Sequence, residues 1–348
     1  MTGTRRVRVD PERPDDAVLA DAGAVIRRGG LVAFPTETVY GLGANALDEA
    51  AVARIFAAKE RALSDPVIVH LADPAEIARV AAAVPPAARL LAERFWPGPL
   101  TLVLPKQNHV PANVTAGRPT VGVRVPRHPV AQGLIRAAGV PIAAPSANRF
   151  TRTSATLAEH VLDDLEGRVD LILDAGPAPI GIESTVVAVD AASVRLLRPG
   201  AVSAEEIAAV IAPLGVELRR GALDPSEAPG LMKRHYAPRA RLTVFHGPPD
   251  RAVAAALAQA AAAIAAGRRV GALFADDDAP EVPPGLLVER LGPRSDLPAI
   301  ARHLFAALRR LDRAGVELIV APTFGETGLG AAIFDRLSRA AEGRVVTV

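Results

Sequence analysis

The chain has 348 residues, of which 50% are hydrophobic and 22% charged, and it contains no cysteine. This composition supplies enough apolar area for packed domains and excludes a disordered tail protein. The lack of cysteine excludes a disulfide framework, a thiolate zinc site, an iron–sulfur cluster and a cysteine nucleophile. The formal net charge of +2 predicts no partner by itself, and the length favours two domains of roughly 150 residues each.

The first 16 positions are mostly polar and lack the apolar stretch of a secretory signal. The longest weakly polar run, 252–267, is mostly alanine and too short to cross a bilayer, so it predicts a buried helix. We therefore expect a cytoplasmic protein without a membrane segment.

Short apolar runs alternate with helical patterns in the first two thirds of the chain. Strands are expected at 31–34, 67–71, 101–105, 121–125, 141–145, 171–174, 185–189 and 194–197. Helices are expected at 48–59, 74–83, 129–138, 156–165 and 204–212, with Asp48 and Ser203 as N-caps. The alternation predicts an α/β fold, and the hairpin pattern of the last two strands predicts a mixed sheet.

A segment rich in turn formers follows and predicts an interdomain linker. Beyond it, strands are expected at 241–247, 268–275, 285–291 and 316–322, and helices at 249–266, 297–314 and 329–341. This order predicts a smaller three-layer α/β domain. The predicted division is an N-terminal lead (1–16), a first domain (17–215), a linker (216–240) and a second domain (241–348).

The charge distribution is more informative than the net charge. No aspartate or glutamate occurs between Arg94 and Ala158, a window that contains eight lysines and arginines. A segment with only positive charges is typical of one that binds an anion, most often phosphate. The alternative interpretation is that these arginines are scattered over the surface and form no common site. Neither a Walker-type phosphate loop nor a complete GxGxxG motif is present, and GLGAN (41–45) is only half of the latter. Its Gly41 and Gly43 would allow close backbone approach or a positive φ.

Five polar loops follow predicted elements and share one chemistry. They are FPTETVYGLG (34–43), the pair Lys59 and Arg61, APSAN with its Ser/Thr/Arg continuation (144–156), GIEST (181–185) and LRPG (197–200). Taken singly, each has an ordinary structural explanation: a cap, a cation at a helix C-terminus, or a turn. Together they offer hydroxyls and arginines without a nucleophile–base pair, which favours an enzyme that positions anionic reactants over a covalent hydrolase.

Several of these stretches are recognisable as motifs. FPTETVYGLG, the K-x-R of Lys59 and Arg61, the I-V-H ending at His70, FWPGPLTLVL, VGVRVP, PIAAPSAN, ILDAGP, GIESTVV and LLRPGAVS resemble, in this order, the YrdC/Sua5 family. PGLMKRHYAP in the linker and GLGAAIFDRLSRAA near the end resemble the two-domain Sua5 form. The resemblance implies a YrdC-like twisted mixed-sheet domain followed by a smaller Rossmann-like three-layer domain.

The resemblance also implies an activity. The family comprises nucleotidyltransferases that make threonylcarbamoyl-AMP and pyrophosphate from L-threonine, bicarbonate and ATP, for the N6-threonylcarbamoyl modification of adenosine 37 in tRNA. Mg²⁺ would bind through the ATP phosphates without side-chain ligands, and no organic cofactor is expected. The implied partners are a downstream tRNA threonylcarbamoyl transferase complex and a weak direct tRNA contact.

The site residues are carried over by matching motifs. Threonine would be bound by Thr36, Thr38, His70, Arg124, Ala144 and Ser184. ATP would be bound by Lys59, Arg61, Asp65, Thr120, Ser146, Asn148, Ser154 and Arg198, and by His235 and Tyr236 of a linker that folds over the mouth as a lid. Lys59 and Arg61 would be the catalytic clamp. This chain departs from the family at Asp65, where an amide is usual, in PSANRFTRTSAT, and at Leu231–Lys233.

Two alternative functions are also compatible with parts of the sequence. The acid-free basic segment could bind RNA, but only Phe95, Trp96 and Phe150 are available there for stacking on bases. Alternatively, the same carbamoyl-adenylate chemistry could serve another pathway, as in hydrogenase maturation proteins. Those proteins carry an additional catalytic domain and zinc-finger cysteines, and this chain has no cysteine.

Overall fold

The computed structural model describes residues 3–191, 193–221, 227, 229, 235–278 and 281–348. The chain divides into two compact units. Unit 1 comprises residues 1–150, 154–179 and 183–231, and unit 2 comprises residues 151–153, 180–182 and 232–348. Unit 2 therefore includes two short segments from within the first two thirds of the sequence.

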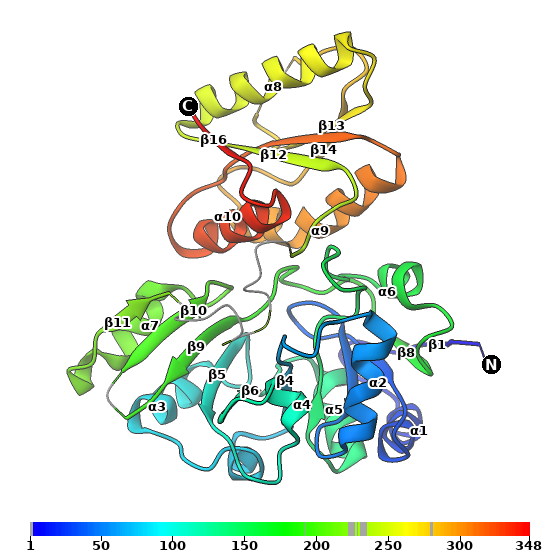
Figure 1. The fold of residues 1–348 in the computed structure, drawn as a ribbon, viewed down its shortest axis with the longest axis vertical. Coiled ribbons are helices and arrows are strands. Elements are labelled where there is room, and N and C mark those ends of the chain that lie inside the picture. The colour runs from blue at the N-terminus through cyan, green and yellow to red at the C-terminus, as the bar shows by residue number, and fades with distance from the viewer. Residues whose placement is uncertain (1–2, 192, 222–226, 228, 230–234, 279–280) are drawn as a thin grey trace. The chain divides into compact units, whose positions relative to one another are not determined.

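Unit 1 is built around one mixed sheet, in which the described strands run in the order β1-β8-β2-β3-β7-β4-β6-β5-β9-β10-β11 (Figure 1). The strands are β1 (Arg5–Arg8), β2 (Val32–Phe34), β3 (Gly41–Asn45), β4 (Ile68–His70), β5 (Leu100–Pro105), β6 (Thr120–Arg124), β7 (Ile142–Ala143), β8 (Leu171–Asp174), β9 (Thr185–Val189), β10 (Val194–Arg198) and β11 (Leu218–Arg220). β9 and β10 form the expected antiparallel hairpin, whereas β5 and β9 run parallel. The predicted mixed α/β sheet is confirmed.

The described α-helices of unit 1 are α1 (Asp16–Arg27), α2 (Glu49–Lys59), α3 (Pro86–Phe95), α4 (Ala112–Thr115), α5 (Pro129–Ala138), α6 (Ala158–Leu165) and α7 (Ala204–Ile211). Of these, α1, α2, α5 and α7 begin directly after a residue whose side chain caps them. The Asp48 side chain accepts hydrogen bonds from the amides of Ala50 and Ala51. Ser203 and Glu206 form a reciprocal capping box. Both predicted caps are confirmed.

Some elements differ from the expectation. The segment expected as a helix at 74–83 is a shorter 3₁₀ helix, Pro74–Arg79. GLGAN is strand β3, paired with β2 and β7, and its glycines do not have a positive φ. Close packing explains Gly43, because a Cβ there would lie 2.8 Å from side-chain atoms of Ile142 and Phe34. Two segments without predicted elements, 1–16 and 216–240, contain the edge strands β1 and β11.

Side chains alternate along the central strands and so define two faces of the sheet. Leu102 and Leu104 of β5, like Val121 and Val123 of β6, belong to the large buried core that also receives α2, α3 and α7. A second core under α1 and α5 covers β2, β7 and β8. Because successive residues of a strand point to opposite faces, Thr101, Thr120, Gly122 and Arg124 point away from the large core. Polar side chains are thus gathered on the face of β5 and β6 where the site lies.

Unit 2 is a parallel sheet with helices on both faces. Its strands are β12 (Arg241–His246), β13 (Val270–Phe274), β14 (Leu287–Arg290), β15 (Leu318–Pro322) and β16 (Val345–Thr347), in the order β14-β13-β15-β12-β16. Its helices are α8 (Pro249–Ala265), α9 (Leu297–Arg313) and α10 (Gly328–Ala340). Figure 1 shows α8 on one face and α9 and α10 on the other, which confirms the expected three-layer domain. In the described parts of the chain, no helix combines the length and apolar character needed to cross a membrane.

Candidate active site

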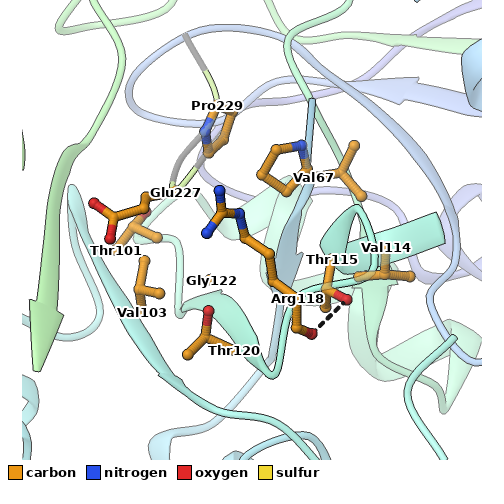
Figure 2. A pocket seen from close by; sticks show the side chains of 11 residues that line it. Val67, Thr101, Val103, Val114, Thr115, Arg118, Thr120, Gly122, Glu227 and Pro229 are labelled. Atoms are coloured by element: carbon orange, nitrogen blue, oxygen red, sulfur yellow. Dashed lines mark hydrogen bonds between the residues drawn. The ribbon is translucent and has the colours of Figure 1, made fainter. Parts of the chain in front are cut away.

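A pocket opens on the polar face of β5 and β6 in unit 1 (Figure 2). It is a shallow depression, with a cavity volume of only ≈ 10 Å³, so its lining side chains rather than its size define it. Its lining residues are Pro66, Val67, Thr101, Val103, Val114, Thr115, Arg118, Thr120, Gly122, Glu227 and Pro229. Thr120, an expected ATP residue, lines it directly. The guanidinium of Arg118 projects into the pocket in the direction of Glu227 and Pro229 of the linker (Figure 2).

Arg198 connects one rim of this pocket to the GIEST loop. Its guanidinium donates to the carbonyl oxygen of Pro229 at 2.9 Å and to the carbonyl oxygen of Ser184 at 2.9 and 3.2 Å. The Ser184 hydroxyl lies 2.8 Å from the hydroxyl of Thr101. A Cβ on Gly200 would lie 2.3 Å from the backbone nitrogen of Thr185, so only glycine permits this approach of the two loops. An expected ATP residue and an expected threonine residue are therefore in direct contact.

Arg124 is the centre of a second buried group. Its guanidinium donates to the Thr38 hydroxyl at 2.9 Å and to the carbonyl oxygen of Gly98 at 3.1 Å, and it lies 2.8 Å from the Glu37 carboxylate. The hydroxyls of Thr36 and Thr38 are 2.8 Å apart. These contacts fix the FPTETVYGLG loop against β6. They bring the guanidinium of Arg124 and the hydroxyls of Thr36 and Thr38 together in a buried cluster.

His70 lies beside Arg124, because β4 and β6 pair in parallel with His70 opposite Arg124. Burial, together with the positive charge of Arg124, lowers the pKa of His70 to about 3. The imidazole is therefore neutral at physiological pH, and its Nδ1 has no hydrogen-bond partner among the described residues. Ala144, another expected threonine residue, is joined to the same strand by its amide, which donates to the carbonyl oxygen of Ile68 at 2.9 Å.

The burial of His70 predicts a stability that falls on acidification. The unfolded chain binds a proton at this ring near pH 6.5, whereas the folded chain binds it near pH 3, so the free energy of unfolding falls as the pH drops from 6.5 towards 3. Between pH 7 and pH 5 the difference is about 2 kcal/mol. Chemical denaturation at both pH values measures it, and His70→Gln is expected to lose this part of the fall. The control is His109→Gln, which alters an exposed ring of the same unit; an undiminished fall in His70→Gln would contradict the prediction.

Lys59 is the last residue of α2, Arg61 lies two positions further on, and the two side chains contact different segments. The buried ammonium of Lys59 donates to the carbonyl oxygens of Ser146 and Asn148 in the APSAN loop. Arg61 forms a buried ion pair with Asp65 at 2.9 Å and donates to the carbonyl oxygen of Pro66 at 2.7 Å. The Lys59 contacts reach residues 87 and 89 positions away, so this cation does more than interact with the dipole of its own helix.

Asp65 and Ser154 also have defined partners. Asp65, which stands where the family has an amide, is the ion partner of Arg61. Pro66, next to it, lines the pocket, so the Arg61 group and the pocket adjoin. The buried hydroxyl of Ser154 donates to the carboxylate of Glu183, the residue before Ser184.

His235 and Tyr236 belong to unit 2. Both are buried, their rings are 4.1 Å apart, and Tyr236 stacks on Phe305 of α9 at 5.7 Å. The guanidinium of Arg336 lies 5.1 Å from the Tyr236 ring centroid. Leu231–Lys233, where the sequence differs from the family pattern, lie outside the residues that the structure describes.

The structure thus brings expected residues of unit 1 into three groups, around Arg124, around Arg198 and around Lys59 with Arg61. The sequence did not single out Thr101, Arg118 or Glu227 as site residues. Thr101 and Arg118 both lie in the acid-free window, and Thr101 also lies in the FWPGPLTLVL motif, whereas Glu227 had no such signal. No cluster of three or more metal-ligating side chains occurs within the residues that the structure describes.

Comparisons with known proteins agree with this fold. A family model described as telomere recombination (Sua5_yciO_yrdC) matches residues 24–200, and one described as threonylcarbamoyl-AMP synthase, C-terminal domain, matches residues 202–342. The chain is 45% identical over 336 residues to the threonylcarbamoyl-AMP synthase of Bacillus subtilis, covering 95% of both proteins. It is 40% identical over 202 residues to a putative threonylcarbamoyl-AMP synthase of Mycobacterium tuberculosis, covering 58% of this chain and 92% of that protein.

A solved structure extends the match to three dimensions. The crystal structure of Pyrococcus abyssi Sua5 complexed with L-threonine matches with a TM-score of 0.92 and 43% identity, covering 99% of this chain and 100% of that one. The chain belongs to the Sua5/YrdC/YciO family, in its two-domain form.

Proposed function

We propose that this chain is a threonylcarbamoyl-AMP synthase, a nucleotidyltransferase that makes threonylcarbamoyl-AMP and pyrophosphate from L-threonine, bicarbonate and ATP. One observation carries the proposal: buried cations hold hydroxyls and backbone carbonyls from segments far apart in the sequence of unit 1, in a chain similar along its whole length to proteins of that name. Such a site suits reactants that are all anionic or zwitterionic.

The threonine side of the site is assigned to the Arg124 group. The guanidinium of Arg124 would bind the threonine carboxylate, and neutral His70 would offer a hydrogen bond without adding charge. Thr36, Thr38, Ala144 and Ser184 complete the assigned set. The amine then adds to bicarbonate with loss of water, which gives a carbamate within reach of the nucleotide.

The ATP side is assigned to the Lys59 and Arg198 groups. A carbamate oxygen forms a bond to the α-phosphorus, the bond to the bridging oxygen breaks, and pyrophosphate leaves with the electron pair. Lys59, Arg61 and Arg198 would offset the developing negative charge. Thr120, Ser146, Asn148 and Ser154 would hold the nucleotide, and Asp65 would act through Arg61. Mg²⁺ bound to the phosphates would supply further positive charge.

The remaining assignments extend the proposal. We assign catalysis to residues 17–215, with 216–240 as a lid that carries His235 and Tyr236 towards the nucleotide, and 241–348 as a separate domain. The carbamate is labile in water, so a lid that excludes water would protect it. The product would pass in the cytoplasm to a tRNA threonylcarbamoyl transferase complex, with at most a weak direct tRNA contact.

The proposal predicts a strict dependence on both small substrates. Purified chain with ATP, L-threonine and ¹³C-bicarbonate should release pyrophosphate and form an adenylate that carries the label, detected by mass spectrometry. Omission of threonine or of bicarbonate should abolish pyrophosphate release. Release that persists without either substrate would point to a different acyl-adenylate chemistry, and salt-sensitive RNA binding without turnover would favour the rival RNA-binding hypothesis.

A further inference from the structure

Two loops of the first two thirds of the chain belong structurally to unit 2. They are residues 151–153 and 180–182. Each loop immediately precedes one member of a hydrogen-bonded pair, since Ser154 follows the first loop and Glu183 follows the second. Ser154 is one of the residues assigned to ATP, and Glu183 precedes Ser184 of the threonine side. The two loops therefore connect unit 2 covalently to the proposed site.

The first loop is fixed by α9 and by the segment around Tyr236. The buried guanidinium of Arg309, on α9, donates to the carbonyl oxygen of Thr153. The amide of Ala237 donates to the carbonyl oxygen of Thr151 at 2.8 Å, and Arg152 forms a parallel β-bridge with Ala237. The backbone is thus held directly before Ser154.

The second loop lies directly on the backbone of α9. Gly181 has a φ of +85°, and a Cβ there would lie 2.4 Å from the Cα of Arg302 and 2.5 Å from the carbonyl oxygen of Ala301. No side chain fits at that distance, so Gly181 is required by close approach as well as by its backbone conformation. The contact at Gly181 thus also fixes the backbone two residues before Glu183, with Ile182 between them.

Unit 1 fixes the other end of each segment. The carbonyl oxygen of Ala155 accepts a hydrogen bond from the amide of Tyr40 at 2.8 Å, and the amide of Thr185 donates to the carbonyl oxygen of Pro99 at 3.0 Å. Ser154 and Glu183 therefore lie between an anchor in unit 2 on one side and an anchor in unit 1 on the other. A shift of either loop would change the direction of the Ser154 hydroxyl.

We infer that the second domain positions the nucleotide site through α9: Arg309 and the Gly181 contact are positioning features that set the geometry of Ser154 and Glu183. This inference rests on the proposed function for its choice of ATP as the ligand. It gives the second domain a part in substrate binding that does not require any of its own residues to touch the reacting atoms.

The test compares two neighbouring arginines of α9. Arg309→Met removes the donor to Thr153, whereas Arg310→Met removes a surface ion pair with Glu289 inside unit 2 and serves as the matched control. We expect Arg309→Met to raise the KM for ATP about tenfold, because a small displacement of a binding group weakens binding steeply. The KM for threonine and kcat should change little, and Arg309→Lys should restore part of the ATP affinity.

Hydrogen exchange supplies a readout that does not depend on the reaction. Peptides covering 150–156 and 180–185 should exchange faster in Arg309→Met than in the parent or in Arg310→Met, while the rest of unit 2 keeps its protection. Gly181→Ala, which displaces the second loop, should show the same pattern and replaces Arg309→Met if that variant does not fold.

The outcomes separate the inference from the function. Unchanged exchange and an unchanged KM for ATP in both variants would overturn the positioning role, as would equal effects in Arg310→Met. If the parent protein forms no threonylcarbamoyl-AMP, the proposed function is wrong. In that case, faster exchange of the two loops alone in Arg309→Met would still support the coupling of α9 to Ser154 and Glu183.

Discussion

Replacing Lys59 with methionine should lower kcat/KM for pyrophosphate release by about 10²–10³-fold, because it removes the buried cation that we assign to the developing phosphate charge. Methionine keeps the apolar stem of the side chain, so the packing at the end of α2 is largely preserved. Initial rates of pyrophosphate release at saturating threonine and bicarbonate measure the effect.

The control for this variant has to be a lysine of similar structural status. Lys106 serves as the comparison: its ammonium also donates to a backbone carbonyl of unit 1, that of Val110 at 3.1 Å, although its side chain is less buried than that of Lys59. Lys106→Met should keep the parent's rate. Equal losses in both variants, or normal turnover in Lys59→Met, would count against the phosphate clamp.

The four buried cations of the site share a feature that bears on how these variants are interpreted. Lys59, Arg61, Arg124 and Arg198 are each at most 7% exposed, and each donates to at least one backbone carbonyl. A buried charge needs such partners, so these residues shape their loops even before a substrate binds. The proposed catalytic roles therefore fall on side chains that also shape their loops, and a loss of activity alone does not separate the two roles.

Local patterns predicted most of the fold. Strand runs such as 185–189 and caps such as Asp48 depend on neighbouring residues, so the sequence alone reveals them. Strand β1 was missed because four residues, three of them arginine, show no apolar alternation, although pairing with β8 makes them an edge strand. The glycines of β3 resembled a loop because their function, close packing against Phe34 and Ile142, depends on distant residues.

The site was predicted as a set of residues but not as a set of contacts. Motifs selected Arg124 and Thr38, yet the hydrogen bond between them joins residues 86 positions apart. Asp65 was identified as a departure from the family pattern among the expected ATP residues, and its pairing with Arg61 only appears in three dimensions. The fixing of the Ser154 loop by Arg309 spans 156 positions and has no local signature at all.

Replacing Arg124 with methionine should destabilise the protein by about 3–5 kcal/mol, since it leaves the Glu37 carboxylate buried without its charge partner. It should also weaken threonine binding by about 10- to 100-fold, the range expected for a lost hydrogen bond to a charged group. Denaturant unfolding and the KM for threonine measure the two effects. Arg127→Met, which alters an exposed arginine of the same segment, should change neither.

A second substitution separates the two effects. In the double variant Glu37→Gln/Arg124→Met the buried carboxylate is replaced by a neutral amide, so most of the lost stability should return. The guanidinium that would bind the threonine carboxylate is still missing, so the KM for threonine should stay high. If the double variant regained threonine affinity together with stability, Arg124 would serve only to neutralise Glu37, and the amino-acid subsite would have to be sought elsewhere on this face of the sheet.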